Sequence, residues 1–92
     1  MTRPSLGRIV HYTLNAYDVS SINSSTVLNG RNRVTEGQVY PAMVVATFGG
    51  AESSAANLKV FLDGGPDAGY WATSRCEGDG PGYWMWPPRV PA

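Results

Sequence analysis

The sequence predicts an all-β domain: a small five-stranded SH3-like barrel with a long loop after its first strand. Three observations predict this fold. Short runs are rich in β-branched and aromatic residues, clusters of Gly and Pro separate those runs, and charged residues are few. The chain has 92 residues, including 11 Gly and 7 Pro, and only 15% are charged, against about 25% in a typical soluble domain. At this length a single domain over residues 1–92 is expected.

The first half of the chain predicts two strands and a long connection between them. Residues 8–14 alternate between two sets of side chains in the manner of a strand. Residues 15–37 predict a long polar loop, because Ser and Asn outweigh the one helical turn that Asp18 could cap. A second strand is expected at 39–48, with Pro41 at its start or on a sheet edge, since proline has no N–H to donate.

Two further strands are expected at 58–63 and 70–76. Strict alternation sorts their side chains by face. It puts Leu58, Val60 and Leu62 on one face of the third strand, with Lys59, Phe61 and Asp63 on the other, and it groups Trp71, Thr73 and Arg75 on one face of the fourth.

The end of the chain predicts a tight Gly-rich loop at 77–82, a short fifth strand at 83–86 and a Pro-rich tail at 87–92. An OB-like barrel would require a helix between the third and fourth strands. Residues 64–69 are too few and too rich in Gly to form one, so the SH3-like arrangement is favoured.

The composition excludes several classes of function. A net charge of zero argues against an electrostatic nucleic-acid binder, which needs surplus Lys and Arg. A single cysteine, Cys76, cannot form an intramolecular disulfide. The N-terminus has no apolar signal segment, and no run approaches the ~18 apolar residues of a membrane span. We therefore expect an intracellular protein that does not enter a membrane.

No residue pattern predicts catalysis, a metal site or a cofactor. His11 is the only histidine and Cys76 the only thiol, so a zinc site would need mostly carboxylates. Pairing His11 with Cys76, or with Ser74 and Asp63, matches no nucleophile motif. The Gly-rich loop at 77–82 lacks the Lys-Ser/Thr pair of a phosphate-binding loop. The protein is not expected to be an enzyme.

The aromatic residues are the main functional signal. Five of them crowd residues 70–86, and each covers ~150–250 Å², more than one small barrel can bury. Arg75 and Arg89 flank these rings as cations for a planar or phosphorylated ligand. The predicted ligand-binding residues are Trp71, Trp84, Trp86, Phe61, Arg75, Arg8 and His11. In the alternative interpretation, two or three Trp close the end of the barrel and the other rings lie in a dimer interface.

Four blocks of sequence, at 7–12, 40–45, 57–64 and 80–87, resemble a family of small tailed-bacteriophage and prophage proteins. The family pattern runs roughly GR-VHY, PA-VV, VNL-VF-DG and PGTWHWP. The chain departs from it with Tyr83 in place of Thr and Met85 in place of His, so no role is expected to rest on a histidine at 85. The resemblance implies a phage origin and a compact β fold, and no activity.

Three functions follow as expectations. The first is a non-enzymatic phage protein that sequesters a nucleotide-like signalling molecule of host defence, as a homo-oligomer in the cytoplasm of the infected bacterium. The second is a virion accessory protein, such as a capsid decoration or head–tail component. The third is a single-stranded nucleic-acid binder whose rings stack bases, which the neutral charge disfavours.

Overall fold

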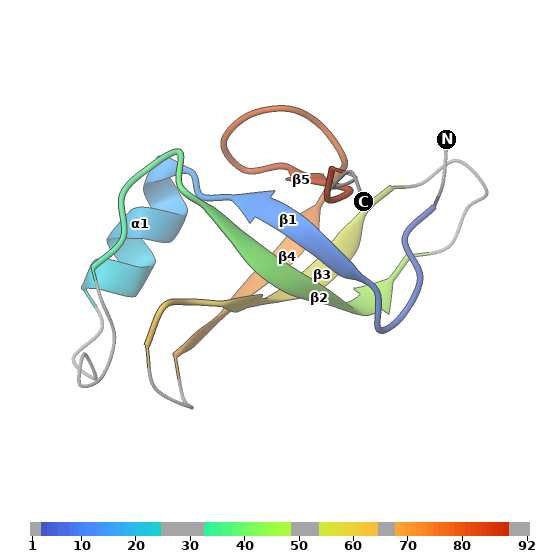
Figure 1. The fold of residues 1–92 in the computed structure, drawn as a ribbon, viewed down its shortest axis with the longest axis horizontal. Helices are drawn as coiled ribbons and strands as arrows, with labels where there is room; N and C mark the ends of the chain where they lie inside the picture. The colour runs from blue at the N-terminus through green and yellow to red at the C-terminus, as the bar shows by residue number, and fades with distance from the viewer. Residues whose placement is uncertain (1–2, 25–32, 49–53, 65–67, 89–92) are drawn as a thin grey trace.

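The structure is a computed structural model that describes residues 3–24, 33–48, 54–64 and 68–88. Its elements are β1 (Ile9–Thr13), α1 (Ala16–Asn23), β2 (Val39–Thr47), β3 (Ala56–Phe61), β4 (Gly69–Arg75) and β5 (Trp84–Met85) (Figure 1). The five strands form one antiparallel sheet, so the predicted all-β fold is confirmed, with one short helix added. Every strand boundary lies within two residues of its prediction.

The sheet has the strand order β4-β3-β2-β1-β5. Within the described residues β4 and β5 do not pair, so strand pairing leaves the sheet open where the predicted barrel would close. β5 instead meets the segment that follows β4. The Trp84 N–H donates to the Cys76 carbonyl (3.1 Å), and the Gly78 N–H donates to the Trp84 carbonyl (2.9 Å). The SH3-like detail of the fold stays a prediction.

The polar stretch after β1 begins with a helix, so the expectation of a loop throughout 15–37 is wrong. Asn15 is the N-cap and accepts a hydrogen bond from the Asp18 N–H (2.8 Å), while the Asp18 carboxylate accepts one from the Asn15 N–H (3.0 Å). This reciprocal capping box satisfies two N–H groups that would otherwise lack partners. Burial of Ile22 then anchors the helix on the core. Residues 25–32 lie outside the described residues.

The core lies on the inner face of the sheet and follows the alternation of the strands. Along β3 and the two residues after it, Leu58, Val60 and Leu62 are buried, as predicted. Lys59, Phe61 and Asp63 are exposed, also as predicted. Trp84 is the largest fully buried side chain. Pro41 is the third residue of β2, a central strand, and comes just before Ala42, where pairing with β3 begins. The residue without an N–H donor therefore lies at the beginning of the β2–β3 ladder.

A β-bulge in β4 changes the face of Arg75. Between the pairs Leu58–Ala72 and Ala56–Arg75, β4 advances three residues while β3 advances two. The extra residue is accommodated by Ser74, whose φ is 56°, and the Ser74 N–H donates to Asn57 Oδ1 (2.8 Å). An added residue moves all later side chains to the opposite face. The prediction that Arg75 shares a face with Trp71 is therefore wrong, and Arg75 points to the inner face.

Candidate functional site

The structure divides the predicted ligand-binding residues between the two faces of the sheet. His11, Phe61 and Trp71 lie on the outer face, whereas Trp84, Trp86, Arg75 and Arg8 lie on the core side. Arg89, expected beside the rings, falls outside the described residues, as do the other residues of the segment 89–92. The seven residues thus do not form one site.

Trp84 and Trp86 close the core next to β5. The Trp84 indole N–H donates to the carbonyls of Ser54 (3.0 Å) and Arg75 (3.1 Å). The Trp86 ring packs edge-on against Trp84, with 5.2 Å between their centroids, and the Arg8 guanidinium lies 4.9 Å from the Trp86 centroid. Since Trp84 has no exposed surface, its ring is part of the core and reaches no ligand.

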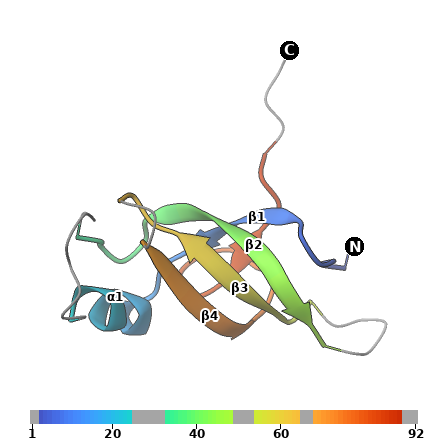
Figure 2. The ribbon, with the colours of Figure 1, turned by 90° about the horizontal axis from the view of Figure 1, so that it is seen from below.

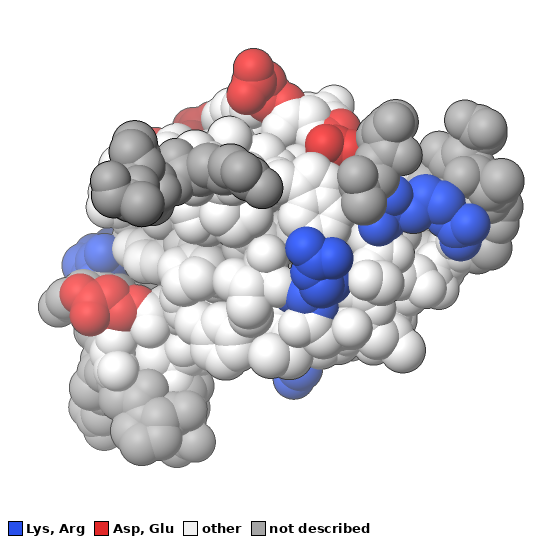
Figure 3. Space-filling view, turned by 45° about the vertical axis from the view of Figure 1, so that its right-hand side comes forward, with Lys and Arg blue, Asp and Glu red and all other residues white. Residues whose placement is uncertain are grey.

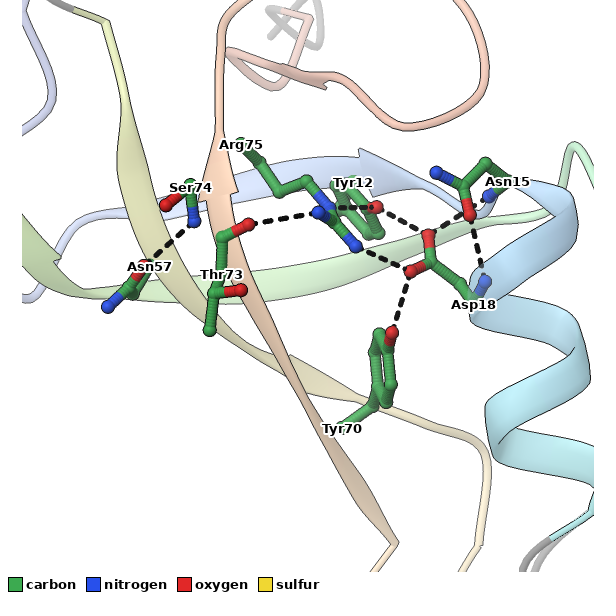
Figure 4. Close-up of polar contacts among 8 residues, drawn as sticks. All are labelled: Tyr12, Asn15, Asp18, Asn57, Tyr70, Thr73, Ser74 and Arg75. Atoms are coloured by element: carbon green, nitrogen blue, oxygen red, sulfur yellow. Dashed lines mark hydrogen bonds and ion pairs between the residues drawn. The ribbon is translucent and has the colours of Figure 1, made fainter.

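Arg75 is held by a buried carboxylate, Asp18, which the sequence did not single out as a site residue (Figure 4). Asp18 Oδ1 accepts from Arg75 Nη2 (2.8 Å) and from the Tyr70 hydroxyl (2.7 Å). Asp18 Oδ2 accepts from the Tyr12 hydroxyl and the Asn15 N–H, and the Tyr12 oxygen accepts from Arg75 Nε (2.7 Å). The cation is neutralised within the fold, so it is not free to bind the anion of a ligand.

The same hydrogen bonds set the pKa values of this cluster. Burial alone would raise the pKa of Asp18, but the hydrogen bonds that its carboxylate accepts, from Tyr12 first, lower that pKa below 3.8. Burial and the hydrogen bond to the Asp18 carboxylate raise the pKa of Tyr70 to about 12. At neutral pH the cluster is therefore an ionised carboxylate surrounded by neutral hydroxyls and one guanidinium.

The low pKa of Asp18 predicts a loss of stability in acid. A carboxyl whose pKa is lower in the folded than in the unfolded chain stabilises the fold above the unfolded pKa of about 4. That contribution disappears as the pH falls through the folded pKa. We expect Asp18→Asn to be less stable than the wild type at pH 7, and the difference to shrink steadily below about pH 4. Urea unfolding at several pH values measures it, and a difference that does not change with pH contradicts the assignment.

The outer face of the sheet carries the exposed rings. We use the term aromatic face for the side chains of Ile9, Met43, Lys59, Phe61 and Trp71. Register pairs Ile9 with Met43, Met43 with Lys59 and Lys59 with Trp71, so these four form one row across four strands. Phe61 follows Lys59 by two residues on β3 and has the same orientation. Trp71 is 60% exposed and Phe61 is 46% exposed.

Gly69 leaves the Phe61 ring open towards β4. Gly69 is the partner of Phe61 in the register and has no side chain to cover the ring. A Cβ built there would meet only the Val60 carbonyl oxygen, at 3.6 Å, an ordinary contact. Glycine is therefore not required by packing at this position. Its consequence is an uncovered aromatic ring beside Lys59 and Trp71.

Charged groups are sparse on the surface around these elements. Figure 3 shows one side of the molecule, on which Lys, Arg, Asp and Glu form a few small groups among mostly uncharged atoms. Of the five side chains that define the aromatic face, Lys59 is the charged one, and the exposed Asp63 follows Phe61 by two residues. His11 lies in the neighbouring row, opposite Pro41 and Met85. The face thus offers stacking surfaces with a single cation, and carries no acid–base pair.

Comparisons with protein-family models, curated proteins and solved structures gave no match. In the four described segments, no group of three or more His, Cys, Asp and Glu is placed to hold a metal ion. The helix in the described part of the chain is too short to cross a membrane. The candidate site is therefore the aromatic face.

Proposed function

We propose that this chain is a non-enzymatic binding protein that takes a planar, anionic, nucleotide-like molecule on its aromatic face. The exposure of Trp71 supports the proposal, because 60% of this large residue is accessible although Trp84 shows that the core can bury an indole completely. Large rings at the surface gain free energy when a planar partner covers them.

The spacing of the aromatic face fits such a ligand. Trp71 lies opposite Lys59 and is the diagonal neighbour of Phe61, a separation of roughly 7–8 Å between Cα atoms. The rings provide stacking surfaces for a base, and Lys59, which is opposite Trp71 and two residues before Phe61, supplies the cation that a phosphate requires. Arg75 and Trp84, which the sequence predicts as ligand contacts, are not part of this site.

The biological setting of the proposal comes from the sequence resemblance to small phage proteins. A phage protein with such a face would sequester a signalling nucleotide of host defence in the cytoplasm of the infected cell. Binding without turnover suffices for this role. It fits a face that has one cation and lacks an acid–base pair.

Trp71→Ala tests the proposal. A titration with cyclic dinucleotides, ADP-ribose and ATP, followed by tryptophan fluorescence and thermal unfolding, should identify a ligand of the wild type. At ~100 times its Kd, that ligand should stabilise the fold by roughly 2.7 kcal/mol. Loss of the indole should weaken binding by about 1–3 kcal/mol, the contribution of one stacked base.

Tyr17→Ala is the matched control, because Tyr17 is an aromatic residue on α1 that is 71% exposed and lies outside the aromatic face. It should bind the ligand as the wild type does. Failure of every nucleotide to bind, or equal losses in the two variants, contradicts the proposed site. Tight binding of long oligonucleotides with a steep salt dependence would favour the nucleic-acid alternative.

A virion accessory protein is the second candidate, because an exposed apolar face also suits docking onto another protein. Mass spectrometry of purified virions separates the two. A decoration or head–tail protein is present there in many copies, whereas a cytoplasmic binder is absent.

A further inference from the structure

β4 ends the sheet with an unpaired edge. In the strand order β4-β3-β2-β1-β5, β4 has β3 on one side and no described strand on the other, and Figure 2 shows it as the outermost of the labelled strands on that side. The backbone N–H and C=O groups along such an edge are a template for another strand.

The ladder identifies which groups of β4 face outwards. The Leu62 N–H donates to the Ala68 carbonyl (3.0 Å), so the residue just before β4 bonds towards β3. Residues of an antiparallel strand alternate between bonding to one neighbour and to the other. Tyr70 and Ala72 therefore bond to β3. Gly69, Trp71 and Thr73 direct their N–H and C=O groups to the open edge, where the Thr73 carbonyl also accepts from Arg75 Nη1 (2.9 Å).

The usual protection of edge strands is weak in this segment. Natural edges carry Lys, Pro or inward-pointing charges that block a second strand. Residues 69–73 contain no charged residue and no proline. The bulge at Ser74 and the inward-turned Arg75, whose guanidinium contacts the Asp18 carboxylate and the Thr73 carbonyl, protect the edge beyond Thr73. They limit the pairing segment to 69–73.

We propose that a second copy of this chain pairs with β4 in antiparallel fashion, so that two sheets join into one. A register with Trp71 opposite the partner's Trp71 uses every outward-facing residue, because Gly69 then lies opposite the partner's Thr73. The segment has no charge, and the chain has zero net charge, so two copies meet without repulsion. Self-complementary pairing of this kind is the isologous contact of a two-fold dimer.

The pairing has a consequence for the ligand site, and this part rests on the proposed function. Directly opposite residues of an antiparallel pair point to the same face, with about 5.5 Å between Cα atoms where both hydrogen bonds form. Trp71 and the partner's Trp71 would therefore project side by side. The two aromatic faces become continuous across the two-fold axis, and one nucleotide is bound for every two chains.

Charge placement at the two ends of the segment tests the register. Gly69→Lys combined with Thr73→Lys puts like charges opposite each other twice, whereas Gly69→Glu combined with Thr73→Lys puts opposite charges there. Both pairs of substitutions change the same exposed positions. In sedimentation equilibrium we expect a dimer for the wild type, at least a tenfold weaker dimer for the first variant, and a dimer for the second. A monomeric wild type at 100 µM, or no difference between the variants, overturns the proposal.

Amide hydrogen exchange of the wild type gives a readout that needs no substitution. The Gly69 and Trp71 amides should be protected at concentrations where the dimer forms and should lose protection on dilution, while the Val60 amide on the inner strand β3 stays protected. Outward amides that exchange at the same rate at every concentration overturn the pairing. A dimer that binds no nucleotide overturns the proposed function alone, and a stoichiometry of one nucleotide per chain overturns the composite site alone.

Discussion

Asp18→Ala should lower the free energy of unfolding by about 3–5 kcal/mol, the usual cost of removing one partner from a buried ion pair. The carboxylate is fully buried and accepts hydrogen bonds from four groups, those of Arg75, Tyr70, Tyr12 and the Asn15 backbone. Without this carboxylate, the Arg75 guanidinium loses its counterion, although only 19% of the Arg75 side chain is exposed. Urea unfolding measures the change.

Two variants make this prediction specific to the cluster. Asp79→Ala removes an exposed carboxylate and should change stability by no more than about 0.5 kcal/mol. Tyr70→Phe keeps the ring and removes one hydrogen bond to a charged acceptor, which should cost about 1.5–3 kcal/mol and still leave a folded chain. A loss of less than about 1 kcal/mol for Asp18→Ala would show that the cluster does not hold the fold together.

Trp84→Ala should lower the free energy of unfolding by about 3–5 kcal/mol, as large-to-small substitutions of buried aromatic residues do. Trp84 is the largest fully buried side chain, and its indole N–H satisfies the Ser54 and Arg75 carbonyls. The substitution creates a cavity and leaves two carbonyls without this donor. Chemical denaturation followed by circular dichroism measures the loss.

Trp71→Ala is the matched control for Trp84→Ala, because it removes the same side chain from an exposed position on the same sheet. In dilute solution, where the chain is monomeric, it should change stability by no more than about 0.5 kcal/mol. If both substitutions destabilised the chain equally, the division between core and surface tryptophan would be wrong.

The strands could be predicted because their sequence pattern is local. Alternation of apolar and polar residues at 9–13 and 56–61 places one set of side chains inwards whatever the neighbouring strand is. The helix was missed because Ser and Asn favour loops by composition. The signal that reveals it is the pair Asn15 and Asp18, spaced as a capping box.

The candidate site was predicted less well than the fold. The aromatic character of Phe61 and Trp71 predicts that they contact a ligand, and the structure exposes both on one face. Arg75 and Trp84 are predicted as ligand contacts because a cation and a large ring suit a nucleotide. In the fold, Arg75 pairs with Asp18 and Trp84 is buried in the core. Residue type alone does not distinguish a ring or a cation that meets a ligand from one that completes the core, because both tasks need the same chemistry.

The sequence by itself determined an all-β domain of five short strands and a surplus of aromatic residues, since alternation, Gly and Pro positions and composition are properties of neighbouring residues. The tertiary structure decided which face each ring occupies. The bulge at Ser74 inverts the alternation of β4. Asp18 forms an ion pair with Arg75, which is 57 residues away in the sequence. Both depend on register and on contacts between distant segments, which follow from packing the whole chain at once.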